Sequence, residues 1–237
     1  MNDVWSRKGI LSPSLISCCD LCNLERCVQT LETARIDMLH VDILDGHFSP
    51  SMPLGLDTVA QLRSRTALPG RRFRFDVHLM ATENDFFVDE LLRAGADQIV
   101  FHAETEPNLD YRLNQIHAAG VRAGIALRPA TPLSVLEYVL EKCDAVLLML
   151  INPGYAQCRS EGQVPYAARK VRELRAMIRE RGLSTKIILD GRISRQDLAA
   201  YIPDGLADIF VAGSTCLNRQ ELATSAAALV QYRDTLL

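Results

Sequence analysis

The stretch MLHVDILDGHFSP, Met38–Pro50, begins as an apolar run typical of a buried β-strand and reaches an Asp-Gly turn. Successive side chains of a strand point to opposite faces, so His40 and Asp42 share one face. A carboxylate buried beside an imidazole is costly unless both groups are satisfied. The stretch therefore predicts a strand whose polar face binds something.

Short runs of the same kind, rich in Val, Ile and Leu, recur along the chain, as expected for parallel strands covered on both sides. The predicted strands are Leu11–Cys18, Met38–Asp45, Arg72–Met80, Ala96–Glu104, Arg122–Pro129, Ala145–Asn152, Lys186–Gly191 and Ala207–Ser214. Amphipathic stretches lie between them, and several end in glycine, which is typical of a helix stop. Four of these predicted helices span 23–36, 84–95, 109–120 and 169–182.

Eight strands that alternate with helices favour an α/β chain closed into a (β/α)8 TIM barrel over the alternative, a doubly wound open sheet. No linker or low-complexity tract divides the 237 residues, so we expect a single domain over 1–237, with 1–9 as a short N-terminal leader. The one irregular segment is the long loop Asn152–Pro165 after the sixth predicted strand.

Composition and charge exclude several classes of function. A net charge of −3 argues against a general nucleic-acid-binding protein but allows a local site for a small anion. No apolar run approaches the roughly 20 residues of a membrane helix, and no secretory leader is evident at the start of the chain. With seven cysteines, an odd count, we expect a reduced, cytoplasmic protein with no nucleic-acid or membrane partner.

Four of the cysteines cluster in CCDLCNLERC, Cys18–Cys27. Their spacing matches no familiar zinc pattern, and no histidine pair accompanies them. We therefore interpret them as small packing residues beside the start of a helix rather than as a metal site.

In a barrel of this kind the functional groups lie at the carboxyl ends of the strands. His40, Asp42, His78 and Asp190 all lie at or near such ends. An aspartate at a strand end can simply cap the next helix. Two imidazoles and two carboxylates that meet at one barrel mouth can instead ligate a divalent ion and leave room for substrate oxygens.

Eight segments, in order from about residue 11 to about residue 217, resemble the ribulose-phosphate 3-epimerase family. They are SPSLIS (12–17), LHVDILDGHFSPSMPLG (39–55), FDVHLM (75–80), AGADQIVFHAE (94–104), GIALRPATPLSVLEYVL (124–140), LLMLINPGY (147–155), ILDGRIS (188–194) and ADIFVAGS (207–214). The resemblance implies a (β/α)8 barrel that epimerises C3 of a ketose phosphate with one bound divalent metal ion. It implies His40, Asp42, His78 and Asp190 as the metal ligands, with Asp42 and Asp190 also as the catalytic acid–base pair.

The resemblance also implies a set of substrate contacts. They are Ser14, the methionines Met80 and Met149 beside the reacting carbons, Gly154 in the loop after the sixth strand, and Gly191, Gly213 and Ser214 at the phosphate. A third methionine position of the family is Leu44 here. His102, at the end of the fourth predicted strand, either supports a metal ligand or is an ordinary buried histidine.

The chemistry explains why such a site needs these groups. Inversion of a carbon beside a carbonyl removes a proton from one face and returns a proton to the other, which calls for two positioned carboxyls. Two nearby carboxyls readily share one proton. The negative charge of the enediolate intermediate is stabilised by a metal ion acting as a Lewis acid. Zinc, iron, manganese and cobalt all suit a site of two histidines and two aspartates.

Three departures from the family pattern lie near the expected substrate. They are the loop after the sixth strand, Arg192 in place of a second glycine, and Arg128 where the family often has asparagine or lysine. Arg192 either adds a contact to phosphate or carboxylate or is a solvated surface charge. The reaction type is therefore expected to be kept, on a ribulose 5-phosphate/xylulose 5-phosphate type of substrate or, alternatively, on a ketohexose 6-phosphate of the allulose 6-phosphate type.

Two other functions and the assembly state complete the hypotheses. A sugar-phosphate lyase on the same barrel needs a lysine at a strand end, and none of Lys8, Lys142, Lys170 and Lys186 has that position. A non-catalytic sugar-phosphate-binding protein would be expected to lack one aspartate of the pair, yet both are present. Relatives are often dimers or hexamers, so we expect a homo-oligomer.

Overall fold

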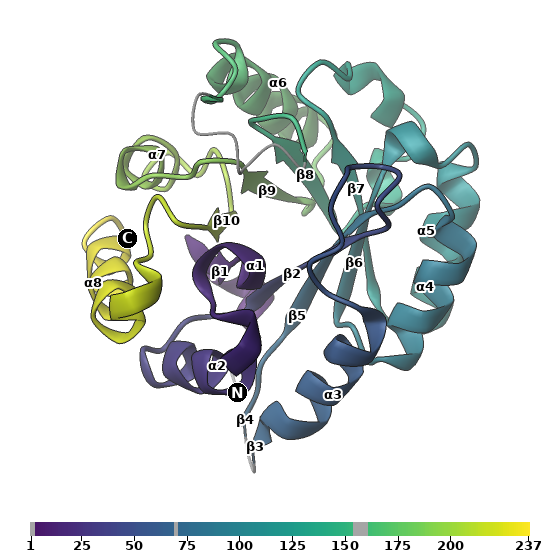
Figure 1. Cartoon of the computed structure of the whole chain (residues 1–237). Helices are drawn as coiled ribbons and strands as arrows, with labels where there is room; N and C mark the ends of the chain where they lie inside the picture. The colour runs from purple at the N-terminus through teal and green to yellow at the C-terminus, as the bar shows by residue number, and fades with distance from the viewer. Residues whose placement is uncertain (1–2, 69–70, 154–160) are drawn as a thin grey trace.

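The computed structural model describes residues 3–68, 71–153 and 161–237, and it shows eight parallel strands that form a nearly closed barrel with helices outside (Figure 1). The strands are β1 (Ile10–Pro13), β2 (Leu39–Leu44), β5 (Phe75–Met80), β6 (Gln98–His102), β7 (Arg122–Leu127), β8 (Ala145–Met149), β9 (Lys186–Asp190) and β10 (Ile209–Ala212). Their order is β1-β10-β9-β8-β7-β6-β5-β2. The predicted single-domain (β/α)8 barrel is confirmed. A short antiparallel pair, β3 (Ala67–Leu68) and β4 (Arg71–Arg72), lies beside it.

The barrel closes between β1 and β2 without a regular ladder. β1 pairs with β10 from Ile10 to Pro13, and on its other side Ser14 forms an isolated parallel bridge with His40. The backbone N–H of Met38 also donates to the Leu11 carbonyl at 3.4 Å. This seam therefore brings Ser14 beside the polar face of β2.

Helices cover the outside of the barrel. They are α2 (Leu24–Thr33), α3 (Leu56–Thr66), α4 (Asn84–Arg93), α5 (Leu109–Ala118), α6 (Ala167–Glu180), α7 (Arg195–Tyr201) and α8 (Leu222–Asp234). The short helix α1 (Leu15–Cys18) instead follows β1 at the carboxyl end of the barrel, inside the ring of the other helices (Figure 1). Between β7 and β8 the chain forms two 3₁₀ turns, Leu133–Leu136 and Leu140–Lys142, instead of an α-helix. None of the described helices combines the length and apolar composition that crossing a membrane requires.

One predicted element is wrong in its second half. The first predicted strand, Leu11–Cys18, ends at Pro13, and the chain turns into α1. The reason lies in spacing: Leu15 and Cys18 are buried and three residues apart, as on one face of a helix, whereas Ile16 and Ser17 between them are partly exposed. This turn points Ser14 toward the barrel mouth.

The strands alternate between two apolar layers. Outward side chains such as Leu39, Val41 and Ile43 pack against the helices, whereas inward ones such as Val100 and Ile188 fill the barrel. Trp5 belongs to the inward layer and lies under the Arg122 guanidinium, 4.6 Å from the ring centre. Since Arg122 begins β7, Trp5 packs at the amino end of the barrel, opposite the mouth.

Candidate active site

Four polar side chains meet at the carboxyl ends of three strands. His40 and Asp42 come from β2, His78 from β5 and Asp190 from the end of β9. One ligand atom of each lies within 4.8 Å of those of the other three. The Asp42 Oδ1 atom lies 3.4 Å from His40 Nε2 and 3.5 Å from His78 Nδ1, and Asp190 Oδ2 lies 3.3 Å from the same His78 nitrogen.

The donor atoms of this cluster fit a metal ion. His40 Nε2 and His78 Nδ1 are buried and have no hydrogen-bond partner among the described residues. An unpaired buried polar atom is costly, and two that face two carboxylates are explained by a shared cation. His40 donates its other ring N–H, at Nδ1, to Asp76 Oδ2 at 2.9 Å, an arrangement that leaves Nε2 free to ligate.

The electrostatics of the cluster favour a cation as well. Burial raises the pKa of Asp42, but the imidazoles of His40 and His78 outweigh it and hold that pKa well below its usual value. Burial lowers the pKa of His40, but the carboxylates of Asp42 and Asp76 outweigh it and hold that pKa well above its usual value. The two imidazoles thus favour the ionised form of Asp42, and a divalent ion would take the place of the imidazole protons.

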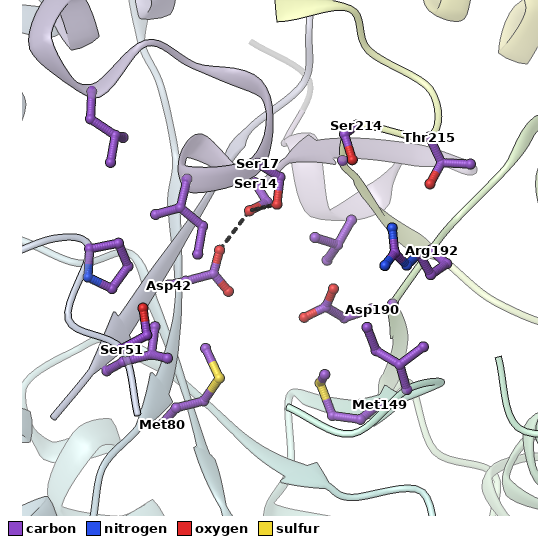
Figure 2. Close-up of a pocket in the computed structure, with 18 of the residues that line it drawn as sticks. Ser14, Ser17, Asp42, Ser51, Met80, Met149, Asp190, Arg192, Ser214 and Thr215 are labelled. Carbon is purple, nitrogen blue, oxygen red and sulfur yellow. Dashed lines mark hydrogen bonds between the residues drawn. The ribbon is translucent and has the colours of Figure 1, made fainter. Parts of the chain in front are cut away.

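A cavity of about 600 Å³ opens over this cluster. Seven of the predicted substrate contacts line it: Ser14, Met80, Met149, Gly191, Arg192, Gly213 and Ser214. The eighth, Gly154, lies outside the described residues. In Figure 2, Asp42 and Asp190 reach toward the same space from opposite walls, with Met80 and Met149 together on one side. Ser14 Oγ donates to Asp42 Oδ2 at 2.7 Å and so orients that carboxylate.

The far end of the cavity depends on backbone conformation. Gly191 has a φ of +118°, and a Cβ there would lie 2.9 Å from the Ile151 nitrogen, so only glycine fits. A Cβ on Gly213 would approach Ser17 Cβ to 3.3 Å. Arg192 is left-handed, with a φ of 55°, a conformation that costs a residue with a side chain roughly 1–2 kcal/mol. Its side chain reaches into the space near Ser214 in Figure 2.

Comparison with known proteins shows the family of this chain. The model of the ribulose-phosphate 3-epimerase family matches residues 10–217. The chain belongs to this family. It is 35% identical over 229 residues to the ribulose-phosphate 3-epimerase of Synechocystis sp., covering 94% of each chain. It is 34% identical over 215 residues to that of Escherichia coli K12, covering 91% of this chain and 92% of the relative. The protein is therefore an enzyme of the isomerase class, an epimerase.

Solved structures support the fold. The chain resembles 3-keto-L-gulonate-6-phosphate decarboxylase from Vibrio cholerae with a TM-score of 0.69 and 14% identity, covering 98% of this chain and 100% of that one. It resembles the tryptophan synthase α subunit from Legionella pneumophila with a TM-score of 0.62 and 15% identity, covering 97% and 94%. At these identities the likeness concerns the barrel alone.

Four polar residues of the cavity lining were not predicted from the sequence. They are Ser17, Ser51, Thr215 and Arg219. Thr215 directly follows the predicted Ser214 and was within reach of the sequence pattern. Arg219 was not, because it lies beyond the last strand. Its guanidinium reaches the mouth by donating Nη2 to the carbonyls of Ile16 and Ser17, at 3.3 and 3.4 Å.

Of the three departures from the family pattern, the loop after the sixth predicted strand includes residues 154–160, which lie outside the described residues, and the other two can be placed. Arg192 lines the cavity, whereas Arg128 lies over the Phe48 ring, 4.2 Å from its centre, and does not belong to the cavity lining. The cysteines of the Cys18–Cys27 cluster within the described chain are free thiols, and two of them, Cys18 and Cys19, are buried. The cluster of possible metal ligands found among the described residues is the one at the barrel mouth.

Proposed function

We propose that the protein catalyses metal-dependent epimerisation at C3 of a ketose phosphate, with Asp42 and Asp190 as the acid–base pair. The observation that carries this proposal is the position of the two carboxylates on opposite walls of one cavity, over the same four-residue cluster (Figure 2). A substrate carbon placed between them has one carboxyl on each face. This is the arrangement that inversion of a stereocentre needs.

Each chain group has a distinct task in this reaction. One aspartate, ionised, removes the C3 proton, while the other, protonated, returns a proton to the opposite face. A divalent ion held by His40, Asp42, His78 and Asp190 would supply Lewis-acid stabilisation of the negative charge that develops on the substrate oxygens. Ser14 holds Asp42 in place through its 2.7 Å hydrogen bond. The thioethers of Met80 and Met149 offer an apolar, polarisable surface to the planar enediolate.

The phosphate is expected at the other end of the cavity. Gly191, Gly213 and Ser214 follow the ends of β9 and β10, where barrel enzymes commonly bind phosphate through backbone N–H groups. Arg192 adds a guanidinium, which pairs well with a phosphate dianion. We propose a substrate of the D-ribulose 5-phosphate/D-xylulose 5-phosphate type, as the names of the relatives indicate.

A ketohexose 6-phosphate is the second candidate substrate. Arg192 stands where the family usually has glycine. It lines the end of the cavity proposed for the phosphate, and the distance from this end to the cluster limits the length of the sugar chain. A lyase that forms a Schiff base is disfavoured. No lysine lines the cavity within the described chain, and Lys170 donates its ammonium to the carbonyls of Arg128, Pro129 and Thr131.

Deuterium exchange tests the proposal directly. The protein, supplied with Zn²⁺, Fe²⁺, Mn²⁺ or Co²⁺ in turn, is mixed in deuterated water with a panel of pentulose and hexulose phosphates, and C3 exchange is followed by NMR. We expect exchange that is lost in Asp42→Asn and in Asp190→Asn and kept in the surface control Asp110→Asn. Full exchange in both active-site variants would contradict the two-aspartate mechanism, and the panel decides between the two sugar lengths.

Homo-oligomeric assembly, as a dimer or hexamer, and a cytoplasmic location stay predictions. Size-exclusion chromatography with light scattering tests the first, and fractionation of cells that express the chain tests the second.

A further inference from the structure

His78, the one metal-site histidine on β5, is connected to a second buried histidine and a carboxylate. Its Nε2 atom lies 2.9 Å from Nε2 of His102, and His102 Nδ1 lies 2.7 Å from Oε2 of Glu104. Both imidazoles are fully buried, and their rings stack with centroids 5.1 Å apart. The Phe48 ring covers His102 at a centroid distance of 4.5 Å. The mechanism above does not use this chain of contacts.

The carboxylate sets the direction of every hydrogen bond in the chain. Glu104 accepts at Oε1 from the backbone N–H of Arg128 at 2.8 Å and from the Thr131 hydroxyl, so it is an acceptor for His102 as well. His102 therefore carries its proton on Nδ1 and presents a lone pair at Nε2. That lone pair can only accept from His78 Nε2–H, which leaves the lone pair of His78 on Nδ1.

Nδ1 of His78 is the atom that faces Asp42 and Asp190, at 3.5 and 3.3 Å. If the bonds ran the other way, a proton would sit on this atom and block a metal ion. In His40 a single hydrogen bond has the equivalent effect. Its Nδ1–H donates directly to the Asp76 carboxylate, which leaves the lone pair on Nε2, the nitrogen that faces the cluster. Two relays of different length thus prepare the two imidazoles for one cation.

The loop that donates to Glu104 is held by a buried cation. The Lys170 ammonium, on α6, donates to the carbonyls of Arg128, Pro129 and Thr131 at 2.8, 2.9 and 2.7 Å. These residues form the loop after β7 that supplies both other donors to Glu104. The loop is therefore fixed against the carboxylate, and the relay has a rigid far end.

We propose that His102 and Glu104 are positioning residues that fix His78 in the tautomer able to ligate the metal ion through Nδ1. This inference rests on the proposed function, because it assumes that the four-residue cluster holds a divalent ion. It assigns a role to two residues that touch neither the substrate nor the ion.

Glu104→Gln is the sharpest test, because it keeps size and shape but introduces a donor. To keep the contacts with Arg128 and Thr131, the new amide must point its NH₂ group at His102, which reverses the relay and puts a proton on His78 Nδ1. We expect the affinity for Co²⁺, measured by competition with a chelator, to fall roughly 10- to 100-fold. The visible absorption spectrum of the Co²⁺ protein should shift, since one imidazole is lost or displaced.

Glu106→Gln is the matched control. Glu106 is a second glutamate, two positions along and more deeply buried than Glu104, and it accepts from the Asn108 backbone N–H and the Arg112 guanidinium rather than from the relay. This control should lose stability but keep the affinity and spectrum of the unsubstituted protein. A drop in affinity equal to that of Glu104→Gln would overturn the inference.

A second pair of variants keeps the test decisive if Glu104→Gln does not fold. His102→Gln retains an acceptor oxygen for His78, whereas His102→Leu does not, so Co²⁺ should bind more tightly to the first. Equal affinities would overturn the relay. If the unsubstituted protein binds Co²⁺ and exchanges C3 while Glu104→Gln keeps its affinity and spectrum, only the relay is wrong. If the unsubstituted protein does neither, the proposed function fails, and the relay with it.

Discussion

The cavity has two ends that are built in different ways. At the cluster end, His40, Asp42 and His78 project from strands, and each imidazole is held by a hydrogen bond to a further buried side chain. At the phosphate end, the lining comes from turns after β9 and β10, including Arg192 in a left-handed conformation and Arg219 held by carbonyls of α1.

This difference separates the reaction from the choice of substrate. Strand side chains are fixed by the register of the whole barrel, so a change at the cluster end disturbs the groups that we propose as the acid–base pair and metal ligands. Turn residues can change without moving the strands. Arg192, a departure from the family pattern that changes size and charge, falls at the phosphate end, whereas Leu44, where the family has methionine, replaces one apolar side chain by another of similar volume.

Removal of the metal ion should have the largest effect and should act on the cluster end alone. Treatment with a chelator is expected to abolish C3 exchange and to lower the free energy of unfolding by about 2.7 kcal/mol relative to protein with free ion at 100 times its Kd. Thermal denaturation and NMR exchange measure the two effects. In Arg192→Gly, the metal ion should raise the free energy of unfolding by the same amount as in the unsubstituted protein. Full C3 exchange in metal-free protein would contradict the assignment of the reaction to the cluster end of the cavity.

Gly191→Ala should damage the phosphate end through the backbone. A φ of +118° costs a residue with a side chain roughly 1–3 kcal/mol, and the contact of the new Cβ with the Ile151 nitrogen at 2.9 Å adds to it. We expect lower stability in urea denaturation and a higher KM. Gly120→Ala is the control, since Gly120 has a φ of +74° but open space around it. Its KM should not change, and an equal rise in both variants would argue against a role of Gly191 at the phosphate.

Arg192→Gly should change KM without a large change in stability. Loss of a charge-assisted hydrogen bond to phosphate is expected to raise KM about 10- to 100-fold with kcat kept. Relief of the left-handed strain, about 1–2 kcal/mol, is largely offset by the extra freedom of glycine in the unfolded chain. Arg35→Gly is the matched control, because Arg35 has a φ of 60° and lies at the exposed end of α2. Equal KM values in the two variants would show that Arg192 does not contact the substrate.

Leu44→Met should have the smallest effect. The substitution restores the third methionine of the family at a position that lines the cavity, and such swaps of similar volume cost less than about 1.5 kcal/mol. We expect kcat to stay close to that of the unsubstituted protein. A large gain in kcat would show that sulfur at this position contributes to the chemistry as well as to the shape.

The strand-borne part of the site was predictable because its geometry is periodic. Alternation along MLHVDILDG places His40 and Asp42 on one face, and the parallel barrel brings the ends of β2, β5 and β9 to one mouth. The same alternation puts Asp76 and His78 on one face of β5. The contact between Asp76 and His40 could not be predicted in this way, because it depends on the register between β2 and β5, which pairs these two residues.

Other features depend on tertiary contacts that leave no local pattern. The turn after Pro13 follows from the burial of Leu15 and Cys18, and apolar content alone made this segment look like strand. The left-handed backbone of Arg192 is unusual for arginine and has no sequence signal beyond the preceding glycine. His102 was open to two interpretations because the hydrogen bond that decides between them comes from another strand.

The seam between β1 and β2 is the edge of the barrel that we expect to open most readily. Its backbone contacts are the Ser14–His40 bridge and the 3.4 Å bond from Met38 to Leu11, and a bound cation would tie β2 to β5 and β9 without touching β1. Local opening costs least where ladder bonds are few, so amide hydrogen exchange should be fastest here among the barrel edges. Across this edge the hydroxyl of Ser14, directly after β1, donates to Asp42, so one serine both connects the two sides of the seam and orients the carboxylate that we propose for proton transfer.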